Sequence, residues 1–180
     1  GIIPGTRRRY LRTLEGTLSA RGLLALEQGQ VLDSAGRKAL VRALDEEEPR
    51  RVLVALEQLA GERDRNFVRA VEKLSRHADA TVRAAALREL AGQESAAAAA
   101  AEEALSDRDP EVRAAAATAF AALARDDAVD RLVPRLEDPS RDVRVAALAG
   151  LLQHGGLEGG IVGGARLGRM LASSSRDERV

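Results

Sequence analysis

One short pattern recurs along this 180-residue sequence: a valine that opens an alanine-rich segment, found at Val52, Val82, Val112 and Val143. Successive valines are 30, 30 and 31 residues apart. Repeats of this length are typical of chains in which each unit is one supersecondary element that cannot bury its apolar face alone. Stacking such units in series gives a continuous core. The repeat therefore predicts a solenoid.

Each valine-led segment has the apolar spacing of a helix. Offsets of three, four and eight residues share one helical face, and they hold Ala55 and Leu56, Ala85 and Ala86, Ala115 and Ala116, Ala146 and Ala147, then Ala60, Leu90, Phe120 and Leu151. Upstream stripes comprise Leu40, Val41 and Leu44; Phe67, Val68, Val71 and Leu74; a run of small residues from Ala96 to Ala101 with Ala104 and Leu105; and Val129, Leu132, Val133 and Leu136. Polar turns such as 106–110 and 137–140 separate the stripes, so each unit is predicted to be helix, turn, helix.

Composition supports an all-helical chain, because aromatic residues make up only 2% and alanine, leucine and valine supply the apolar content. Alanine and leucine favour helices, whereas the aromatic residues that enrich strands are nearly absent. The predicted fold is all-α, an α-α superhelix (solenoid) of about four two-helix repeats over 34–153. Residues 1–33 are expected to form an N-terminal capping helix and a linker.

An aspartate followed six residues later by an arginine, with valine just before the arginine, marks the later repeats. Asp107, Val112 and Arg113 form one copy, and Asp138, Val143 and Arg144 the next. The pattern resembles short HEAT-like repeats of the bilin-lyase type. The resemblance implies a ladder of hydrogen bonds within and between repeats, here through Arg83, Asp107, Arg113, Asp138 and Arg144. Charge-assisted pairing of a planar guanidinium gives the spacing a physical reason.

The two earlier copies depart from this pattern. His77 stands where the aspartate would be in the second copy, with Asp79 near Arg83, and the first copy has Leu53 in the arginine position with Glu47 upstream. The ladder is therefore expected to weaken towards residue 50. Terminal repeats are commonly atypical, which suggests a cap-like first unit.

The N-terminal segment has a helical stripe of Tyr10, Leu11, Leu14 and Leu18 between about Thr6 and Ser19, which could cover the open end of the solenoid. A basic start, a leucine-rich linker and short HEAT-like repeats are together similar to the module that follows the membrane domain of some bacterial ADP/ATP-carrier-like transporters. That resemblance implies that Arg7, Arg8, Arg9 and Arg12 flank a membrane segment on the cytoplasmic side. The alternative is a solvated helix start.

Glycines dominate the C-terminal segment, at Gly159, Gly160, Gly163, Gly164 and Gly168. A phosphate-binding loop is one interpretation, but no strand precedes them and no Lys-Ser/Thr follows. A small-xxx-small packing helix fits better, because it leaves an apolar stripe of Leu157, Ile161, Val162, Ala165, Leu167, Met170 and Leu171. Residues 154–180 are expected to begin a further, truncated repeat, and the sequence itself is expected to be a piece of a longer protein.

The sequence lacks the residue types and spacings that most catalytic chemistry requires. The chain has no cysteine, and its two histidines, His77 and His154, have no partner at metal-ligand spacing. Ser173, Ser174 and Ser175 lack a nucleophile motif. Basic and acidic residues balance at 28 each, so no net field attracts nucleic acid or a membrane. We expect no catalytic, cofactor or metal site, no specific nucleic-acid partner, no membrane insertion and a cytoplasmic location.

Protein interaction is the leading functional hypothesis. The second helices would present two rows of residues to a helix or an extended peptide, namely Val54, Ala84, Ala114 and Val145, and Gln58, Arg88, Thr118 and Ala149. Alternatively, these rows face solvent or another domain of the same protein. A cytoplasmic regulatory module of a nucleotide-transporter-like membrane protein is the second hypothesis. A HEAT-like DNA glycosylase or bilin lyase is the third and is disfavoured by the balanced charge and the absence of tryptophan.

Overall fold

The computed structural model describes residues 34–93 and 97–177, which contain helices and turns and no strand. The fold is an all-α solenoid, as the repeat and the composition predicted. The chain divides into two compact units, with the boundary between Ala70 and Val71. No helix in these two described stretches is both long enough and apolar enough to span a bilayer. The capping helix predicted within residues 1–33 lies outside them.

The first unit contains α3 (Ser34–Ala43), α4 (Pro49–Gln58) and the first turns of α5 (Arg65–Leu74). Pro49 occupies the first turn of α4, where its missing N–H costs no hydrogen bond. Helices α3 and α4 are in contact, and the buried apolar side chains on them and on the residues that follow them include Leu40, Leu44, Val52, Ala55, Leu56 and Leu59. Arg37 Nε and Nη2 donate to Glu62 (3.2 and 3.3 Å), which ties α3 to the segment after α4.

One predicted core position in this unit is wrong. Ala60 is exposed, whereas Leu59 is only 1% exposed. The helix ends at Gln58, and Leu59 N–H bonds back to Ala55 O at its C-cap. Residue 60 therefore follows the helix, and an offset of eight from Val52 no longer falls on its apolar face.

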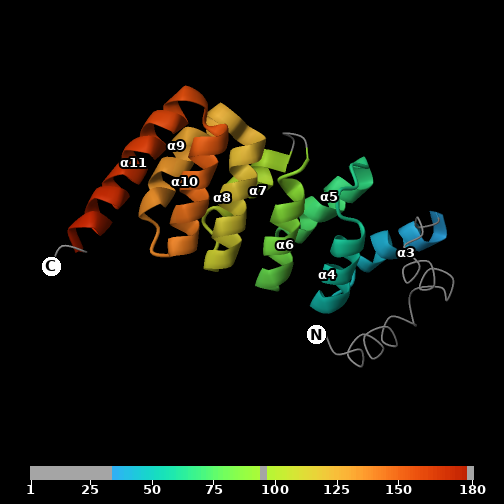
Figure 1. Ribbon diagram of the computed structural model, residues 1–180. Helices are drawn as coiled ribbons and strands as arrows, with labels where there is room; N and C mark the ends of the chain where they lie inside the picture. Colours follow the sequence, from blue (N-terminus) through green and yellow to red (C-terminus); the bar gives the residue numbers. More distant parts are fainter. Residues whose placement is uncertain (1–33, 94–96, 178–180) are drawn as a thin grey trace, which may run out of the picture. The chain divides into compact units, whose positions relative to one another are not determined.

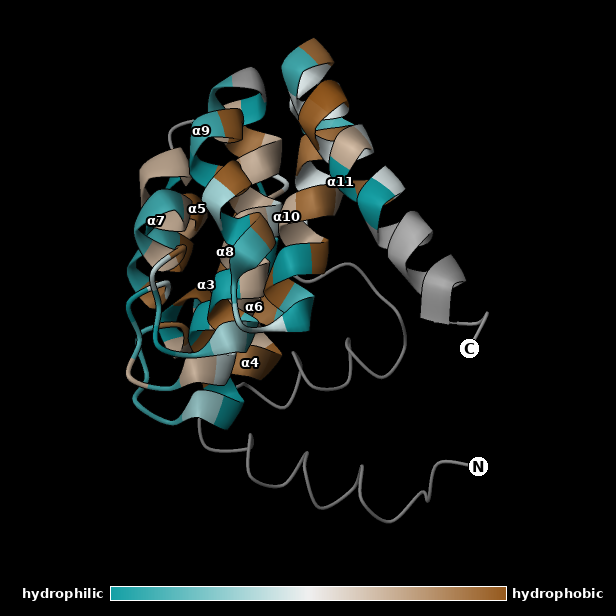
Figure 2. Cartoon of the chain, turned by 90° about the vertical axis from the view of Figure 1, so that its left-hand side faces the viewer, coloured by the Kyte–Doolittle hydropathy of each residue, from teal (hydrophilic) through white to brown (hydrophobic). Residues whose placement is uncertain are grey.

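The second unit continues with α6 (Ala80–Leu90), α7 (Ala98–Ala104), α8 (Pro110–Ala124), α10 (Arg141–His154) and α11 (Gly156–Asp177). Helix α8 packs between α6 and α10, and α11 packs on α10 (Figure 1). Figure 2 shows α7 and α9 (Val129–Leu132) on one side of α8 and α10. The first helices of these repeats therefore form one layer, called the first-helix layer, and the second helices α6, α8 and α10 form the other. Between these layers lie buried side chains that include Val82, Leu87, Leu90, Ala101, Val112, Ala116, Phe120, Leu132, Val143 and Leu151.

The helix expected around Val129 to Leu136 is not a single α-helix. It consists of a 3₁₀-helix η2 (Arg125–Ala128), one α-turn α9 (Val129–Leu132) and a second 3₁₀-helix η3 (Val133–Glu137). Pro134 near the start of η3 has no N–H to donate, and its ring disfavours continuation of α-helix. Leu132 and Leu136 are nevertheless buried, whereas Val133 is 36% exposed.

Helix α11 packs on α10 through glycines. A Cβ built on Gly159 would lie 2.6 Å from Leu151 O, and one on Gly163 would lie 2.9 Å from Leu152 Cδ2. Gly159 has no room for a side chain because its neighbour is backbone, whereas a Cβ at Gly163 would have to displace the flexible end of the Leu152 side chain. The predicted packing helix is present, but Gly160, Gly164 and Gly168 face open space.

The apolar stripe that the sequence assigned to α11 is largely outside the core. Leu157, Ile161 and Leu167 are exposed. Helix α11 packs on α10 through the face of Gly159 and Gly163, which leaves these apolar side chains on its outward side.

Candidate functional site

Arg83, near the start of α6, connects two repeats. Its Nε and Nη2 donate to the two carboxylate oxygens of Asp107 (2.8 and 2.9 Å), which lies in the turn before α8. Its Nη1 donates to the carbonyl oxygens of His77 and Ala78 (both 2.9 Å) in the turn before α6. One guanidinium therefore closes its own turn and binds the turn of the following repeat.

Arg113 of α8 makes the same contacts one repeat later. Its Nε and Nη2 donate to Asp138 (2.9 and 3.0 Å), and its Nη1 donates to the carbonyl oxygens of Asp107 and Arg108 (2.9 and 3.2 Å). Arg144 of α10 makes the contacts within its own turn, because its Nη1 donates to the carbonyls of Asp138 (2.8 Å) and Pro139 (3.0 Å). The five residues expected in a ladder thus lie in one series of hydrogen bonds.

The two aspartates also shape the turns in which they lie. Asp107 Oδ1 accepts from Asp109 N–H (2.8 Å), and Asp138 Oδ1 accepts from Ser140 N–H (2.9 Å). His77 stands at the corresponding place, and its Nδ1 accepts from Asp79 N–H (3.0 Å). The histidine therefore substitutes for the aspartate in the turn. Asp79, expected near Arg83, lies close enough for its charge to act on that arginine, and it also caps α6 by accepting from the N–H groups of residues 81 and 82.

Burial and hydrogen bonding act in opposite directions on these carboxyl groups. Hydrogen bonding from Arg113 lowers the pKa of Asp138, against the effect of burial. Burial alone would raise the pKa of Asp107, but hydrogen bonds from Arg83 and from Asp109 N–H outweigh it and the pKa is lowered. Side-chain exposure is 8% for Arg83 and 15% for Asp107, and 14% for Arg113 and 5% for Asp138. Both carboxylates are therefore charged partners at neutral pH and not proton acceptors poised for catalysis.

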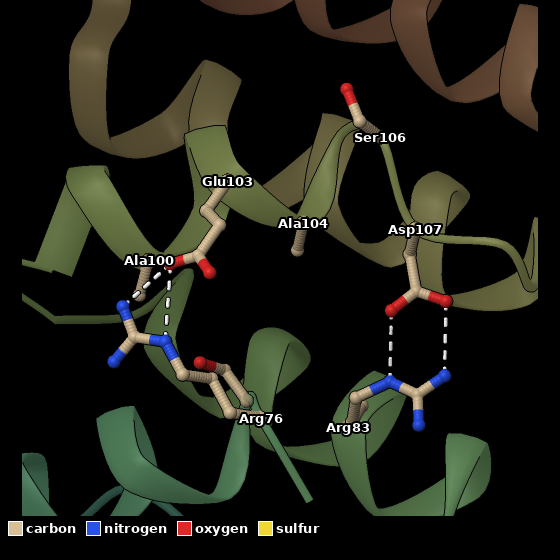
Figure 3. A pocket seen from close by; sticks show the side chains of 8 residues that line it. Arg76, Arg83, Ala100, Glu103, Ala104, Ser106 and Asp107 are labelled. Atoms are coloured by element: carbon tan, nitrogen blue, oxygen red, sulfur yellow. Dashed lines mark hydrogen bonds and ion pairs between the residues drawn. The ribbon is translucent and has the colours of Figure 1, made fainter.

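A cavity of about 370 Å³ lies beside the first of these ion pairs. Arg76 with Glu103 and Arg83 with Asp107 line its two sides, with Ala104 between them (Figure 3). Ligand pockets of this size are mostly apolar and enclosed, with a few convergent polar groups. In this cavity, by contrast, both guanidinium groups already bind carboxylates of the chain itself. The cavity therefore has the character of a polar notch between repeats.

A second row of polar contacts joins the first-helix elements, and sequence reasoning missed it. Arg76 bonds to Glu103, Arg131 to Glu102 and Arg135 to Ser106. The signal was available, since these partners are separated by 27 to 29 residues, close to the repeat length. In the Arg76–Glu103 and Arg131–Glu102 pairs, three of the four side chains are more than half exposed, so these two contacts contribute little to stability.

The residues predicted to form a partner surface differ in their exposure. On the second helices of the second unit, Arg88 and Thr118 are exposed and Val145 is 50% exposed. Arg88 pairs with Glu111 (2.6 Å), and the Thr118 hydroxyl donates to Ala114 O (3.2 Å). In the first unit, Gln58 is exposed and Val54 is half-buried.

Ala84 is a correction to that surface, because it is fully buried. Its single methyl group is too short to protrude beyond the neighbouring side chains of a helix packed against α8. Leu152 of α10 was not predicted on the surface, but it is 43% exposed. The exposed apolar residues of the second-helix layer are therefore Val145 and Leu152, both on α10.

The fold and these contacts define an all-α repeat protein whose helix pairs are joined by arginine and aspartate. Residues 69–153 match the family model described as HEAT repeats, which supports a HEAT-like repeat family for this segment. Proteins with HEAT repeats commonly serve as interaction scaffolds and are generally non-catalytic. No curated protein matches the sequence.

Proposed function

We propose that this chain is a non-enzymatic scaffold that binds a protein partner on the outer surface of α6, α8 and α10. The observation that carries the proposal is the exposure of Val145 (50%) and Leu152 (43%) on α10. Arg88, Glu111 and Thr118 supply polar groups on the neighbouring helices. An apolar strip with a polar margin suits an amphipathic helix or an extended peptide.

The ladder is proposed to have a structural role in this scaffold. Arg83 and Arg113 direct their guanidinium groups to aspartates of the following repeat, and Arg144 directs its own to carbonyl groups of its turn. These contacts hold successive second helices in register. A row of side chains on three helices can bind one partner only if the helices keep that register, because misplaced anchors lose complementarity.

The test is partner capture with matched variants of the chain. Val145→Glu places a charge in the proposed strip, whereas Val133→Glu places the same charge on the first-helix layer at a residue of 36% exposure. Wild-type protein and both variants would first be checked for equal helical circular dichroism. Proteins that cross-link to the wild type and to Val133→Glu but not to Val145→Glu support the proposal. Equal capture by the wild type and both variants would contradict it.

The transporter-module interpretation rests partly on the basic start and leucine-rich linker within residues 7–33, which lie outside the described residues. Their test is the sequence encoded directly upstream, where a membrane domain would show ten or more hydrophobic segments. The glycosylase interpretation has a direct test in titration with duplex DNA at physiological salt, for which the balanced charge leads us to expect no tight binding.

A further inference from the structure

Three arginines of the second helices hold the same place in successive repeats. Arg83, Arg113 and Arg144 each donate from Nη1 to the carbonyl oxygens of the residues five and six positions before them. Because a guanidinium is planar, this contact fixes the direction of its other edge, which carries Nε and Nη2. In Arg83 and Arg113 that edge binds the aspartate of the following repeat. The same edge of Arg144 is therefore presented for the same chemistry.

The Nε and Nη2 edge of Arg144 meets no carboxylate among the side chains that the structure describes. Arg83 and Arg113 bind aspartates that lie 24 and 25 residues further along the chain. The corresponding positions after Arg144 hold Gly168 and Arg169, which lie inside α11 and supply neither a carboxylate nor a turn. Arg144 itself is half-buried. At the repeat spacing, the chain therefore does not supply the acceptor that the two earlier arginines have.

The charges around this edge favour an anion. At about 100° per residue, Arg141 lies about 60° from Arg144 around α10, whereas Asp142 lies about 160° from it. Arg141 is exposed and makes no hydrogen bond or ion pair with a residue whose side chain the structure describes. Glu137, at the end of η3, already pairs with Arg166 of α11 (2.9 Å). The neighbouring acidic side chains are therefore either on the other side of the helix or already paired.

We propose that Arg144 binds a carboxylate of a partner protein, presented in a turn as the ladder aspartates are. The ligand is selected by the chain itself, since the same edge of the same group binds an aspartate in both earlier repeats. Two parallel hydrogen bonds from a guanidinium match the two oxygens of a carboxylate, which gives the site a preference over a neutral amide. The inference rests on the proposed scaffold function, and it specifies that the partner carries an acidic turn.

The site is a weak one when it is tested alone. One bidentate pair at a half-buried position must offset the freedom that a short ligand loses on binding. We therefore expect a dissociation constant on the order of 1–10 mM for a peptide that offers only the acidic turn. A whole partner would gain affinity from additional contacts, such as those with the exposed Val145 beside Arg144.

The test is a titration observed at the Arg144 side chain itself. The probe is the capped peptide Leu-Glu-Asp-Pro-Ser, the sequence of residues 136–140, which contains the aspartate that Arg113 binds. In nitrogen-15-labelled protein, the Nε–H signal of Arg144 is identified by its loss in Arg144→Lys. We expect this signal to shift saturably with the peptide. The signal of Arg50, which is exposed in the first unit, is the control and should not saturate.

Two further probes decide the chemistry of the ligand. The peptide Leu-Glu-Asn-Pro-Ser keeps the turn and the glutamate but lacks the acceptor carboxylate, and it should give no saturable shift. Inorganic phosphate at equal concentration and constant ionic strength should not displace the aspartate peptide. Absence of a saturable shift with the aspartate peptide overturns the proposal, as does equal binding of the asparagine peptide. Displacement by phosphate would indicate a general anion site and would overturn the assignment to a protein carboxylate.

Failure of this site and failure of the proposed function are distinguishable. Val145→Glu leaves Arg144 in place, so its effect on partner capture is judged independently of the peptide titration. Loss of capture in Val145→Glu without peptide binding would retain the strip on α10 and reject the acidic anchor. Peptide binding at Arg144 with capture that is insensitive to Val145→Glu would retain the anchor and reject the strip.

Discussion

Arg113 in α8 and Asp138 in the turn before α10 are joined by two parallel hydrogen bonds, 2.9 Å from Nε and 3.0 Å from Nη2. The pair bridges two repeats, and both side chains are largely buried. A guanidinium suits this place because its planar fork matches both carboxylate oxygens while its remaining nitrogen reaches backbone carbonyls. The stability of the second unit should depend on such pairs.

Replacing Asp138 by asparagine should destabilise the chain strongly. The change leaves the Arg113 guanidinium in a largely buried position without its anionic partner, at a cost of about 3 kcal/mol. Urea unfolding monitored by circular dichroism measures the loss. Asp130→Asn is the matched control, since Asp130 is exposed on α9 and its change should alter the free energy of unfolding by less than about 0.5 kcal/mol. Equal effects of the two substitutions would contradict the role given to the pair.

Acid should weaken the fold through the same carboxyl groups. The pKa values of Asp107 and Asp138 are lowered in the folded chain. Each group therefore binds fewer protons when folded than when unfolded, and stability rises with pH through its titration. Their contribution is complete above the unfolded pKa of about 3.9 and is lost as pH falls through the folded values.

The measurement is the free energy of unfolding in urea as the pH is lowered from neutral to strongly acidic. We expect a decline that begins near the unfolded aspartate pKa and continues below it. Asp138→Asn removes one of the two groups, so its curve should be shallower than the wild-type curve. Parallel curves for the two proteins would show that Asp138 does not contribute to the acid sensitivity.

Helix capping differs between α8 and α10, which permits a direct comparison. Asp109 caps α8 by accepting from Glu111 N–H (2.8 Å) and Val112 N–H (3.4 Å), whereas Ser140 at the start of α10 makes no side-chain cap bond. Asp109→Ala should therefore cost about 1 kcal/mol. Ser140→Ala should change stability by less than about 0.5 kcal/mol. Thermal or urea unfolding would show the difference, and a larger loss for Ser140→Ala would be the contrary result.

A methyl group added at Gly150 should strain the packing of α8 on α10. A Cβ there would lie 2.6 Å from Ala121 Cβ and 3.3 Å from Leu132 Cδ1. Gly150→Ala should therefore destabilise the chain by about 1–3 kcal/mol. Gly168→Ala adds the same group to open space on α11 and should, in dilute solution, stabilise the helix by up to about 1 kcal/mol. Urea unfolding measures both changes. If Gly168→Ala proved less stable than Gly150→Ala, α8 and α10 would be less closely packed than described.

The repeat and its helices could be predicted because valine-led segments of equal length impose equivalent packing. Prediction failed where contacts with neighbouring segments, and not the local sequence pattern, decide whether a side chain is buried. Ala60 was misplaced because α4 ends two residues earlier, and Ala84 was misplaced because exposure depends on the adjacent helix. Pro134 indicated a break in the helix expected around Val129 to Leu136, but the apolar stripe of that segment was read as one continuous helix.

The site residues could likewise be predicted only in part. Spacing within one repeat identified Asp107 and Arg113, yet the carboxylate that Arg113 contacts belongs to the next repeat. That pairing depends on how repeats stack, which no local spacing contains. The two faces of α11 were indistinguishable in sequence, because glycines at 159 and 163 and at 160 and 164 have the same spacing. Only the packing on α10 separates them.

A double-mutant cycle on Arg83 and Asp107 tests most directly whether arginine and aspartate couple successive repeats. Arg83→Met, Asp107→Asn and the double variant would be compared with the wild type by urea unfolding. We predict a coupling free energy of about 2 kcal/mol, so that the double variant is much less destabilised than the sum of the singles. Strictly additive losses would contradict the coupling and, with it, the account of how these repeats are held together.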